Sequence, residues 1–348
     1  MPPARSPASV LLRPLIAVLA MSAILAAPWP VAAAATSPEA PFRFFAPGSP
    51  WNQQLPKTAP LNASSGEFVA SLSREVNREL ETDQGPSIST SSNSVPVYTV
   101  PAGQPTVPVQ LTSAFTVPSL SSAWSAVPLP PTAQPAPGKD HHLVVWQPST
   151  DRLWEFWHLV DGAAGWQAGW GGAMQNASSN FGAYGPTAWP GATGSWGGSA
   201  SSLSIAGGLI TLEDLRKGEI NHALAIGVPQ VRAGEYAAPA ERTDGESTNP
   251  MALPEGAHLR LDPSLELWKL HLPPLTLMIA RAAKRYGIFV RDIAGNVTFY
   301  GQDPATTGGN PYAGPNGFFE GTYPARLLSA FPWTHLQLLQ MQLTDSRG

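Results

Sequence analysis

The sequence predicts a mostly β fold, a β-sandwich or jelly roll with a few peripheral helices. Glycine and proline are abundant, at 32 and 38 residues. Because proline fixes φ and glycine permits turns, we expect many turns and few long helices. Short runs of strand type dominate the chain, and they do not alternate with helices as a parallel sheet would require.

Residues 1–35 have the layout of a cleavable signal peptide. Arg5 and Arg13 give a basic start, an apolar run covers residues 15–27, and small residues lead up to Ala35. The apolar run is short for a bilayer span and ends in prolines. We therefore expect a secreted, extracellular protein that begins near Thr36 and has no membrane segment after cleavage.

Residues 36–348 are expected to form a single secreted β-rich domain. Its first part, residues 36–60, is proline-rich and predicts an irregular segment. Charged residues make up 13% of the chain and the formal net charge is −4, so the basic footprint of a nucleic-acid-binding protein is missing. The absence of cysteine excludes disulfides and thiol chemistry.

Periodicity and capping residues locate the individual elements. Ser65, as an N-cap before apolar residues at helical spacing, predicts a helix over residues 65–80. Further helices are predicted over residues 211–218, 274–286 and 331–343, the last docking on the domain as a C-terminal helix. Strands are predicted over residues 95–99, 107–111, 142–147, 152–158, 222–228, 259–261, 288–290 and 297–300.

Two of these strands, residues 142–147 and 152–158, are joined by good turn residues and predict a hairpin. A four-residue loop would pair Gln147 with Arg152, Val144 with Glu155 and His142 with Trp157. Directly opposed residues share a face of the sheet, so His142, Glu155 and Trp157 would project together. A slip of one residue would separate them.

Several short motifs occur together in this chain: Asp140-His141-His142, Leu153-Trp154-Glu155-Phe156, Gly218-Glu219-Ile220-Asn221-His222-Ala223-Leu224, Pro254-Glu255-Gly256, Arg260-Leu261, and Tyr286-Gly287 with Asp292. In combination, from about Phe44 to Trp333, the chain resembles a family of secreted bacterial proteins without an assigned activity. The resemblance implies a set of functional positions made of Asp140, His142, Glu155, His222 and Arg260. His141 departs from the pattern, so His142 carries more weight.

Glu155 is the most suggestive of these residues, because it lies mid-strand between Trp154 and Phe156. A carboxylate there must be paired, solvated in a cleft, or raised in pKa. Glycan-cleaving enzymes place carboxylates beside apolar rings for acid–base work. The structural alternative is an ion pair with Arg152 or Arg260.

The other polar residues also have two interpretations each. Asp140 would be the second carboxylate and His142 a proton carrier, or they would cap a turn and fill the core. His222 begins a strand and would assist at a sheet rim, or be structural. Arg260 would bind an anionic substrate or pair with a buried carboxylate.

Four tryptophans predict a carbohydrate-binding surface: Trp154, Trp157, Trp166 and Trp170. Trp166 and Trp170 lie among glycines and polar residues, where burial is harder to arrange. For metals, the two histidines and Asp140 match no strong ligand signature. We therefore expect neither a metal nor a cofactor.

These observations lead to three hypotheses. The first is a glycoside hydrolase acting on a polysaccharide through Glu155 and Asp140, assisted by His142 and His222. The second is a polysaccharide lyase with a His or Tyr base and Arg260 neutralising a uronate carboxylate. The third is a non-catalytic carbohydrate-binding or cell-envelope protein.

Overall fold

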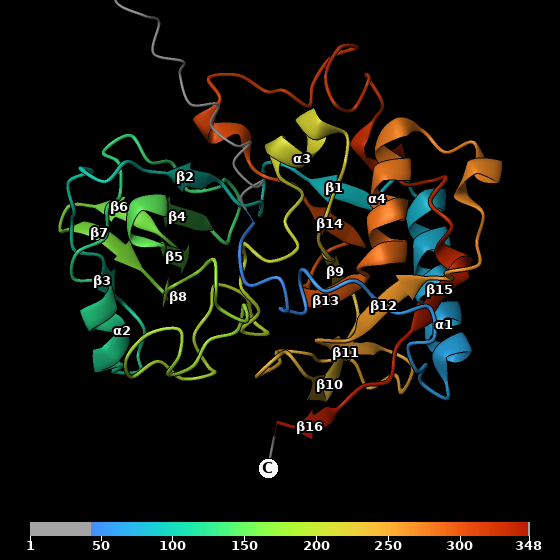
Figure 1. The fold of residues 1–348 in the computed structure, drawn as a ribbon, viewed down its shortest axis with the longest axis horizontal. Helices are drawn as coiled ribbons and strands as arrows, with labels where there is room; N and C mark the ends of the chain where they lie inside the picture. Colours follow the sequence, from blue (N-terminus) through green and yellow to red (C-terminus); the bar gives the residue numbers. More distant parts are fainter. Residues whose placement is uncertain (1–42, 347–348) are drawn as a thin grey trace, which may run out of the picture. The chain divides into compact units, whose positions relative to one another are not determined.

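The computed structural model describes residues 43–346, and they form a β-rich fold with sixteen strands and four α-helices (Figure 1). The predicted signal peptide and residues 36–42 of the predicted domain lie outside this range. Among the described helices, none combines the length and apolar character that crossing a bilayer requires. The sheets are mixed. Five strand pairs are parallel, including β9 beside β13, whereas the sequence did not predict parallel pairing because its strands do not alternate with helices.

The largest sheet has six strands in the order β1-β14-β9-β13-β12-β15. Their bounds are Ser87–Ser89, Thr298–Tyr300, Leu224–Val228, Ile288–Ile293, His258–Leu261 and Leu336–Leu338. The parallel pair β9 and β13 is in register from Leu224 opposite Ile288. Parallel neighbours need a long connection, and here it contains β10, β11, β12 and α4.

A four-stranded sheet has the order β2-β4-β5-β8, with bounds Val97–Thr99, Leu143–Gln147, Arg152–Trp157 and Trp170–Gln175. Its central hairpin confirms the predicted register, since Gln147 pairs with Arg152 and Val144 with Glu155. The turn between them is the 3₁₀ helix η1, Pro148–Thr150.

Two three-stranded sheets complete the set. One has the order β11-β10-β16, with bounds Leu253–Glu255, Val231–Ala237 and Leu343–Asp345. The other has the order β3-β7-β6, with bounds Gln110–Leu111, Gly165–Ala168 and Val160–Gly162.

Helices α1, α3 and α4 lie close to their predicted ranges, whereas α2 was not predicted. Their bounds are α1 Ser65–Glu81, α2 Pro118–Ala123, α3 Leu212–Lys217 and α4 Pro274–Arg285. The N-cap of α1 is Ser64, one residue before the predicted Ser65. Short 3₁₀ turns follow at η2 Leu267–Leu270, η3 Pro304–Thr306, η4 Pro324–Arg326 and η5 Trp333–His335.

The predicted C-terminal helix over residues 331–343 is wrong. This segment contains the turn η5 and strand β15, and β16 begins at its end. Leu336 and Leu338 are both buried while Gln337 between them is partly exposed. That two-residue period belongs to a strand, and pairing with β12 fixes it.

The hydrophobic core lies on both faces of the six-stranded sheet. On one face, Leu224, Ile226 and Val290 pack with apolar residues of α1 and α4. On the other, the small Ala225 and the larger Phe289 join the aromatic core of the four-stranded sheet. The small residues on β9 leave room for a glycine-rich segment, and the Ala225 N–H donates to the Gly208 carbonyl at 3.0 Å.

Candidate functional site

Three carboxylates come together between the six-stranded sheet and the β10–β11 sheet. Asp292 lies on β13, Glu255 ends β11, and Asp244 lies in the loop before it. One oxygen from each lies within 4.8 Å of the others. Glu255 is fully buried, Asp292 is half-buried and Asp244 is exposed. Asp244 and Asp292 can therefore meet a ligand from solvent, and Glu255 cannot.

Backbone contacts after β11 hold this cluster together. The Gly256 N–H donates to the Val290 carbonyl at 2.8 Å, which brings the end of β11 against β13. Gly256 has φ +81°, and a Cβ there would stand 1.7 Å from the Ala237 carbonyl oxygen. Only glycine fits this close backbone approach.

The cluster retains protons at neutral pH. Burial raises the pKa of Glu255 to about 9, and the charges of Asp292 and Asp244 add to this shift. Burial also raises the pKa of Asp292 to about 7, against the lowering effect of Arg291. Burial raises the pKa of Asp244 as well. Crowded, poorly solvated carboxylates cannot all be ionised, so a protonated carboxyl and an ionised one coexist here.

Arg242 places a positive charge at the same site. Its guanidinium lies 5.8 Å from the centre of the Trp170 ring and donates to the Ser199 carbonyl at 2.7 Å. Burial lowers its pKa, while Glu255, Asp292 and Asp244 oppose that shift. Carboxylate oxygens are also what Ca²⁺ prefers. The carboxylates of Asp244, Glu255 and Asp292 have the spacing to hold such a cation. Arg242 already places one positive charge beside them.

Asp140, which precedes β4, lies near the cluster, and Trp157 at the end of β5 contacts Asp140. The Trp157 indole N–H donates to Asp140 Oδ1 at 3.4 Å, and Trp157 pairs with Trp170 across β5 and β8. The Asp140 charge contributes to the raised pKa of Asp292. Of the predicted residues, Asp140 is thus brought near the acidic cluster, Trp157 contacts Asp140, and Trp170 lies beside Arg242.

The segment of residues 197–207, here called the glycine-serine loop, connects the two larger sheets. On the side of the six-stranded sheet, Ser201 Oγ donates to the Arg291 carbonyl at 2.6 Å and Arg291 Nη1 to the Ile205 carbonyl at 3.1 Å. Ala200 gives a backbone hydrogen bond to Asp292. The acidic cluster therefore depends on the position of this loop.

Glu155 holds the same loop from the other side. Its carboxylate accepts from the Gly198 N–H at 2.6 Å, from Ser204 Oγ at 2.6 Å and from the Ile205 N–H at 3.1 Å. Burial raises its pKa and these donors lower it. Glu155 is wholly buried, so it reaches no solvent-borne substrate. The geometry gives it a positioning role, and its predicted catalytic role stays a prediction without geometric support.

His142 contacts the glycine-serine loop at Gly198, which also donates to Glu155. Its Nε2 lies 3.1 Å from the Gly198 carbonyl oxygen, and because a carbonyl only accepts, Nε2 carries the proton. Burial lowers the His142 pKa to about 4, so the ring is neutral. Its Nδ1 is buried and has no hydrogen-bond partner among the described residues. His142 thus joins Glu155 in fixing the loop rather than facing solvent.

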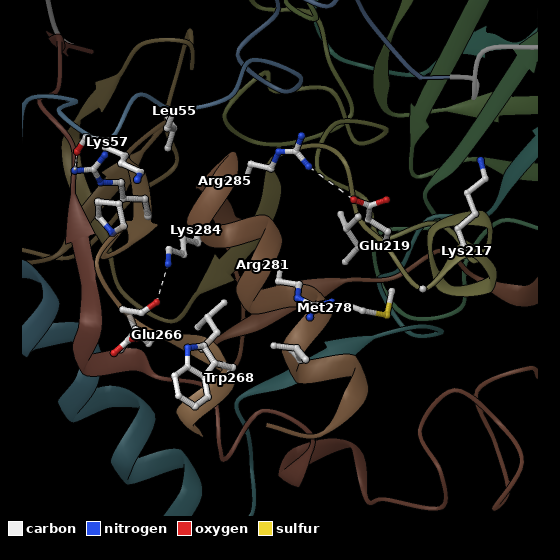
Figure 2. Close-up of a pocket in the computed structure, with 17 residues that line it drawn as sticks. Leu55, Lys57, Lys217, Glu219, Glu266, Trp268, Met278, Arg281, Lys284 and Arg285 are labelled. Carbon is white, nitrogen blue, oxygen red and sulfur yellow. Dashed lines mark hydrogen bonds and ion pairs between the residues drawn. The ribbon is translucent and has the colours of Figure 1, made fainter. Parts of the chain in front are cut away.

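Arg260 lies apart from the acidic cluster. Its guanidinium donates to Gln337 Oε1 at 3.0 Å, to the Pro56 carbonyl at 2.8 Å and to the Lys57 carbonyl at 3.2 Å. It lines a groove beside α4 (Figure 2), although only 4% of the residue is exposed. Its donors are used to attach the N-terminal segment to β12 and β15.

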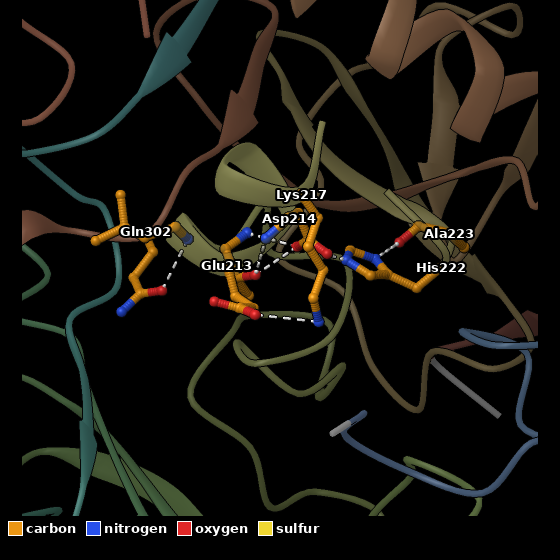
Figure 3. A network of polar contacts seen from close by, with 8 residues as sticks. Glu213, Asp214, Lys217, His222, Ala223 and Gln302 are labelled. Carbon is orange, nitrogen blue, oxygen red and sulfur yellow. Dashed lines mark hydrogen bonds and ion pairs between the residues drawn. The ribbon is translucent and has the colours of Figure 1, made fainter. Parts of the chain in front are cut away.

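His222 also lies outside the cluster, in a network at the start of α3 (Figure 3). Its Nε2 is 3.2 Å from Asp214 Oδ2 and its Nδ1 is 2.8 Å from the Ala223 carbonyl oxygen. Both partners are acceptors, so both nitrogens donate and the ring is cationic. Burial would lower the His222 pKa, but the Asp214 carboxylate outweighs it and the pKa is raised.

The remaining predicted tryptophans divide between core and surface. Trp154 is buried and its indole N–H donates to the Ala123 carbonyl at 3.1 Å, which corrects its prediction as a substrate-binding ring. Trp166 on β7 is half-buried and packs against the aromatic core.

Sequence reasoning missed Arg242, Asp244 and Asp292 as site residues. Asp292 and Glu255 belong to the motifs quoted above, but their placement in one cluster depends on contacts between β11 and β13. The sequence did contain one signal for this site. Asp292 follows Arg291 in an otherwise apolar strand, and two charged residues in such a strand need polar partners. In the comparisons with known proteins, no family model, no curated protein and no solved structure matches this chain.

Proposed function

We propose that the protein is a secreted carbohydrate-active enzyme, a glycoside hydrolase that acts on a polysaccharide. Asp292 serves as the general acid and Asp244 as the second carboxylate. One observation carries the proposal. A half-buried carboxyl whose pKa is raised to about 7 lies within 4.8 Å of an exposed carboxylate, and the Arg242 guanidinium of the same site lies 5.8 Å from the centre of the Trp170 ring.

The roles follow from the environment of each group. A proton donor works best when its pKa is near the working pH, and Asp292 meets this condition because burial and neighbouring carboxylates disfavour its charge. Asp244 is exposed and can approach the anomeric carbon. Glu255 stays protonated in the interior, and the charge of Asp244 disfavours ionisation of Asp292. Carboxyl groups about 5 Å apart are typical of retaining enzymes, whereas inverting ones are wider.

The tryptophans and Arg242 supply binding. Trp157 and Trp170 are half-buried neighbours at the end of β5 and the start of β8. Their rings offer flat apolar surfaces of the kind on which sugar rings stack. We further propose that the four-stranded and six-stranded sheets form a sandwich-like pair, since residues of both contribute to one aromatic core.

The test is a polysaccharide panel digested with the mature protein and read by new reducing ends and by ultraviolet absorbance. Asp292→Asn and Asp244→Asn are each expected to lower turnover by about a hundredfold to ten-thousandfold. The matched control is Asp161→Asn, an exposed aspartate on β6, which should turn over at the wild-type rate.

The rival hypotheses predict other readings. An ultraviolet-absorbing product would identify a lyase, with Arg242 of the acidic cluster facing the uronate rather than Arg260, which lies apart from that cluster. Binding without turnover on any glycan would identify a non-catalytic binding or cell-envelope protein. Either result, or a double variant of Asp244 and Asp292 with full activity, would refute the hydrolase.

A further inference from the structure

A second surface with its own chemistry lies beside α4, in a groove of about 930 Å³ (Figure 2). It shares no residue with the acidic cluster. Helix α4, the turn η2, the segment after α3 and the N-terminal segment near Leu55 contribute its walls. A groove of this volume is large enough for a short oligomeric ligand.

The lining of the groove is basic in a chain whose net charge is −4. It contains two carboxylates, Glu219 and Glu266. The cationic side chains are Lys57, Lys217, Arg260, Arg281, Lys284 and Arg285. Since the chain has 20 basic residues against 24 acidic ones, this collection of cations runs against the overall balance.

Several of these cations lack a carboxylate partner. Arg285 faces Glu219 at 3.7 Å, and Glu266 pairs with Lys269 on η2. Lys284 Nζ donates to a neutral group, the Leu265 carbonyl, at 2.7 Å. Within residues 43–346, neither Arg281 nor Lys57 takes part in an ion pair.

The helix dipole does not account for this arrangement. Basic residues in the last turn of a helix stabilise it, which explains Lys284 and Arg285 on α4. Lys57 comes from a different part of the chain, 217 positions before Pro274, where α4 begins. The positive charges therefore converge on a space rather than on one helix end.

An exposed tryptophan stands at the same groove. Trp268 on η2 is 72% exposed, and Leu267, Leu277 and Met278 add apolar surface beside it. Lys269 lies over the Trp268 ring at 5.2 Å from its centre. A large exposed aromatic residue next to unpaired cations is typical of a binding surface.

We propose that this groove binds an anionic glycan, a chain of sugars bearing carboxylate groups. Sugar rings would lie against Trp268, while the repeated carboxylates would meet the guanidinium groups of Arg281 and Arg285, which suit them geometrically. Phosphate chains without sugar rings would leave Trp268 unused. Single-stranded nucleic acid uses successive aromatic platforms, whereas this groove offers one exposed tryptophan.

The experiment is calorimetric titration of the mature full-length protein. The probes are hexagalacturonate, cellohexaose as a neutral glycan of equal length, and a single-stranded oligonucleotide of equal charge. Hexagalacturonate should bind, and its affinity should fall as salt is raised because the cations are exposed. Cellohexaose should bind at least about tenfold more weakly, a difference that one lost charge contact can produce.

Variants separate charge from stacking. Arg281→Gln and Trp268→Ala should each weaken hexagalacturonate binding by about tenfold. The matched controls lie outside the groove. They are Arg74→Gln, at an exposed arginine on α1, and Phe115→Ala, at a phenylalanine that is 75% exposed. Both controls should bind within about twofold of the wild type, and equal melting temperatures will show that every variant is folded.

Several outcomes would overturn the proposal: no binding of hexagalacturonate, equal binding of cellohexaose, tighter binding of the oligonucleotide, or an equal loss in Arg74→Gln. The result is independent of the proposed hydrolase, because Asp292→Asn should abolish turnover and leave this binding unchanged. Loss of groove binding with turnover intact would identify the failure of this inference alone.

Discussion

Replacing Glu155 by glutamine tests whether this buried carboxylate holds the glycine-serine loop. Glutamine keeps the shape of the side chain but turns one acceptor oxygen into an NH₂ donor. If its oxygen takes the place that faces Ser204 and Ile205, the NH₂ group faces the Gly198 N–H, which now has no acceptor. In the opposite orientation the NH₂ group can donate to the Ser204 hydroxyl, but the Ile205 N–H is left without an acceptor.

The cost can be worked from these contacts. One buried N–H without a partner costs about 1–3 kcal/mol. The loss of charge weakens the remaining bonds, but it also removes the desolvation that raises the pKa of Glu155, so we count only the lost bond. We therefore expect the free energy of unfolding to fall by about 1–3 kcal/mol. A domain of roughly 300 residues has an unfolding entropy of about 0.6 kcal/mol/K, so Tm should fall by about 2–5 °C.

Calorimetry and urea unfolding at neutral pH measure this directly. Ser204→Ala removes one donor and leaves the carboxylate with two, so its Tm should lie between wild type and Glu155→Gln. Glu81→Gln, at an exposed position at the end of α1, is the matched control and should not change Tm. A Glu155→Gln protein with wild-type Tm and abolished turnover would refute the positioning role and restore the catalytic one.

Four further outcomes are expected. The pKa of His222 is raised, so its ion pair with Asp214 stabilises the fold fully below about pH 6.5, and this stabilisation is lost as pH rises through the raised pKa. His222→Gln should flatten the pH dependence of stability measured by urea unfolding, and an unchanged pH dependence would contradict the assignment. Glu255 has a pKa of about 9 against an ordinary 4.5, so the free energy of unfolding should fall as pH rises between these values, because the unfolded chain releases the proton first. Glu255→Gln should lessen this loss of stability, and a greater loss would count against a protonated Glu255. Gly256→Ala should yield little folded protein by circular dichroism, since its Cβ would overlap a backbone oxygen; normal melting would show that the turn can relax. N-terminal sequencing of the secreted protein should begin near Thr36, and an intact leader would disprove cleavage.

The local elements could be predicted because their signals are local. Helix α3 has Thr211 as N-cap, a capping box with Asp214 and a left-handed Gly218 at its end, and all three are visible in one short stretch of sequence. The hairpin register followed from its turn. The C-terminal strands were mistaken for a helix because their pairing partners lie far away in the chain.

The candidate site was predicted only in part, for the same reason. Glu155 was rightly identified as a carboxylate that needs partners. Two of those partners are backbone N–H groups and the third is the Ser204 hydroxyl, all more than forty residues away, and no residue type signals a backbone donor. The acidic cluster is likewise assembled from a loop, the end of β11 and the middle of β13, so it exists only after the sheets have formed.

The last strands of the chain have a consequence for the order of folding. Strand β15 completes the edge of β12, and β16 completes the edge of β10, although these belong to different sheets. During synthesis from the N-terminus, both edges stay open until about the last ten residues of the described chain emerge. Strand β1 likewise has no pairing partner until β14 is synthesised, more than two hundred residues later. Such distant pairings slow folding, so these three edges stay unpaired long after the local hairpin of β4 and β5 has both of its strands.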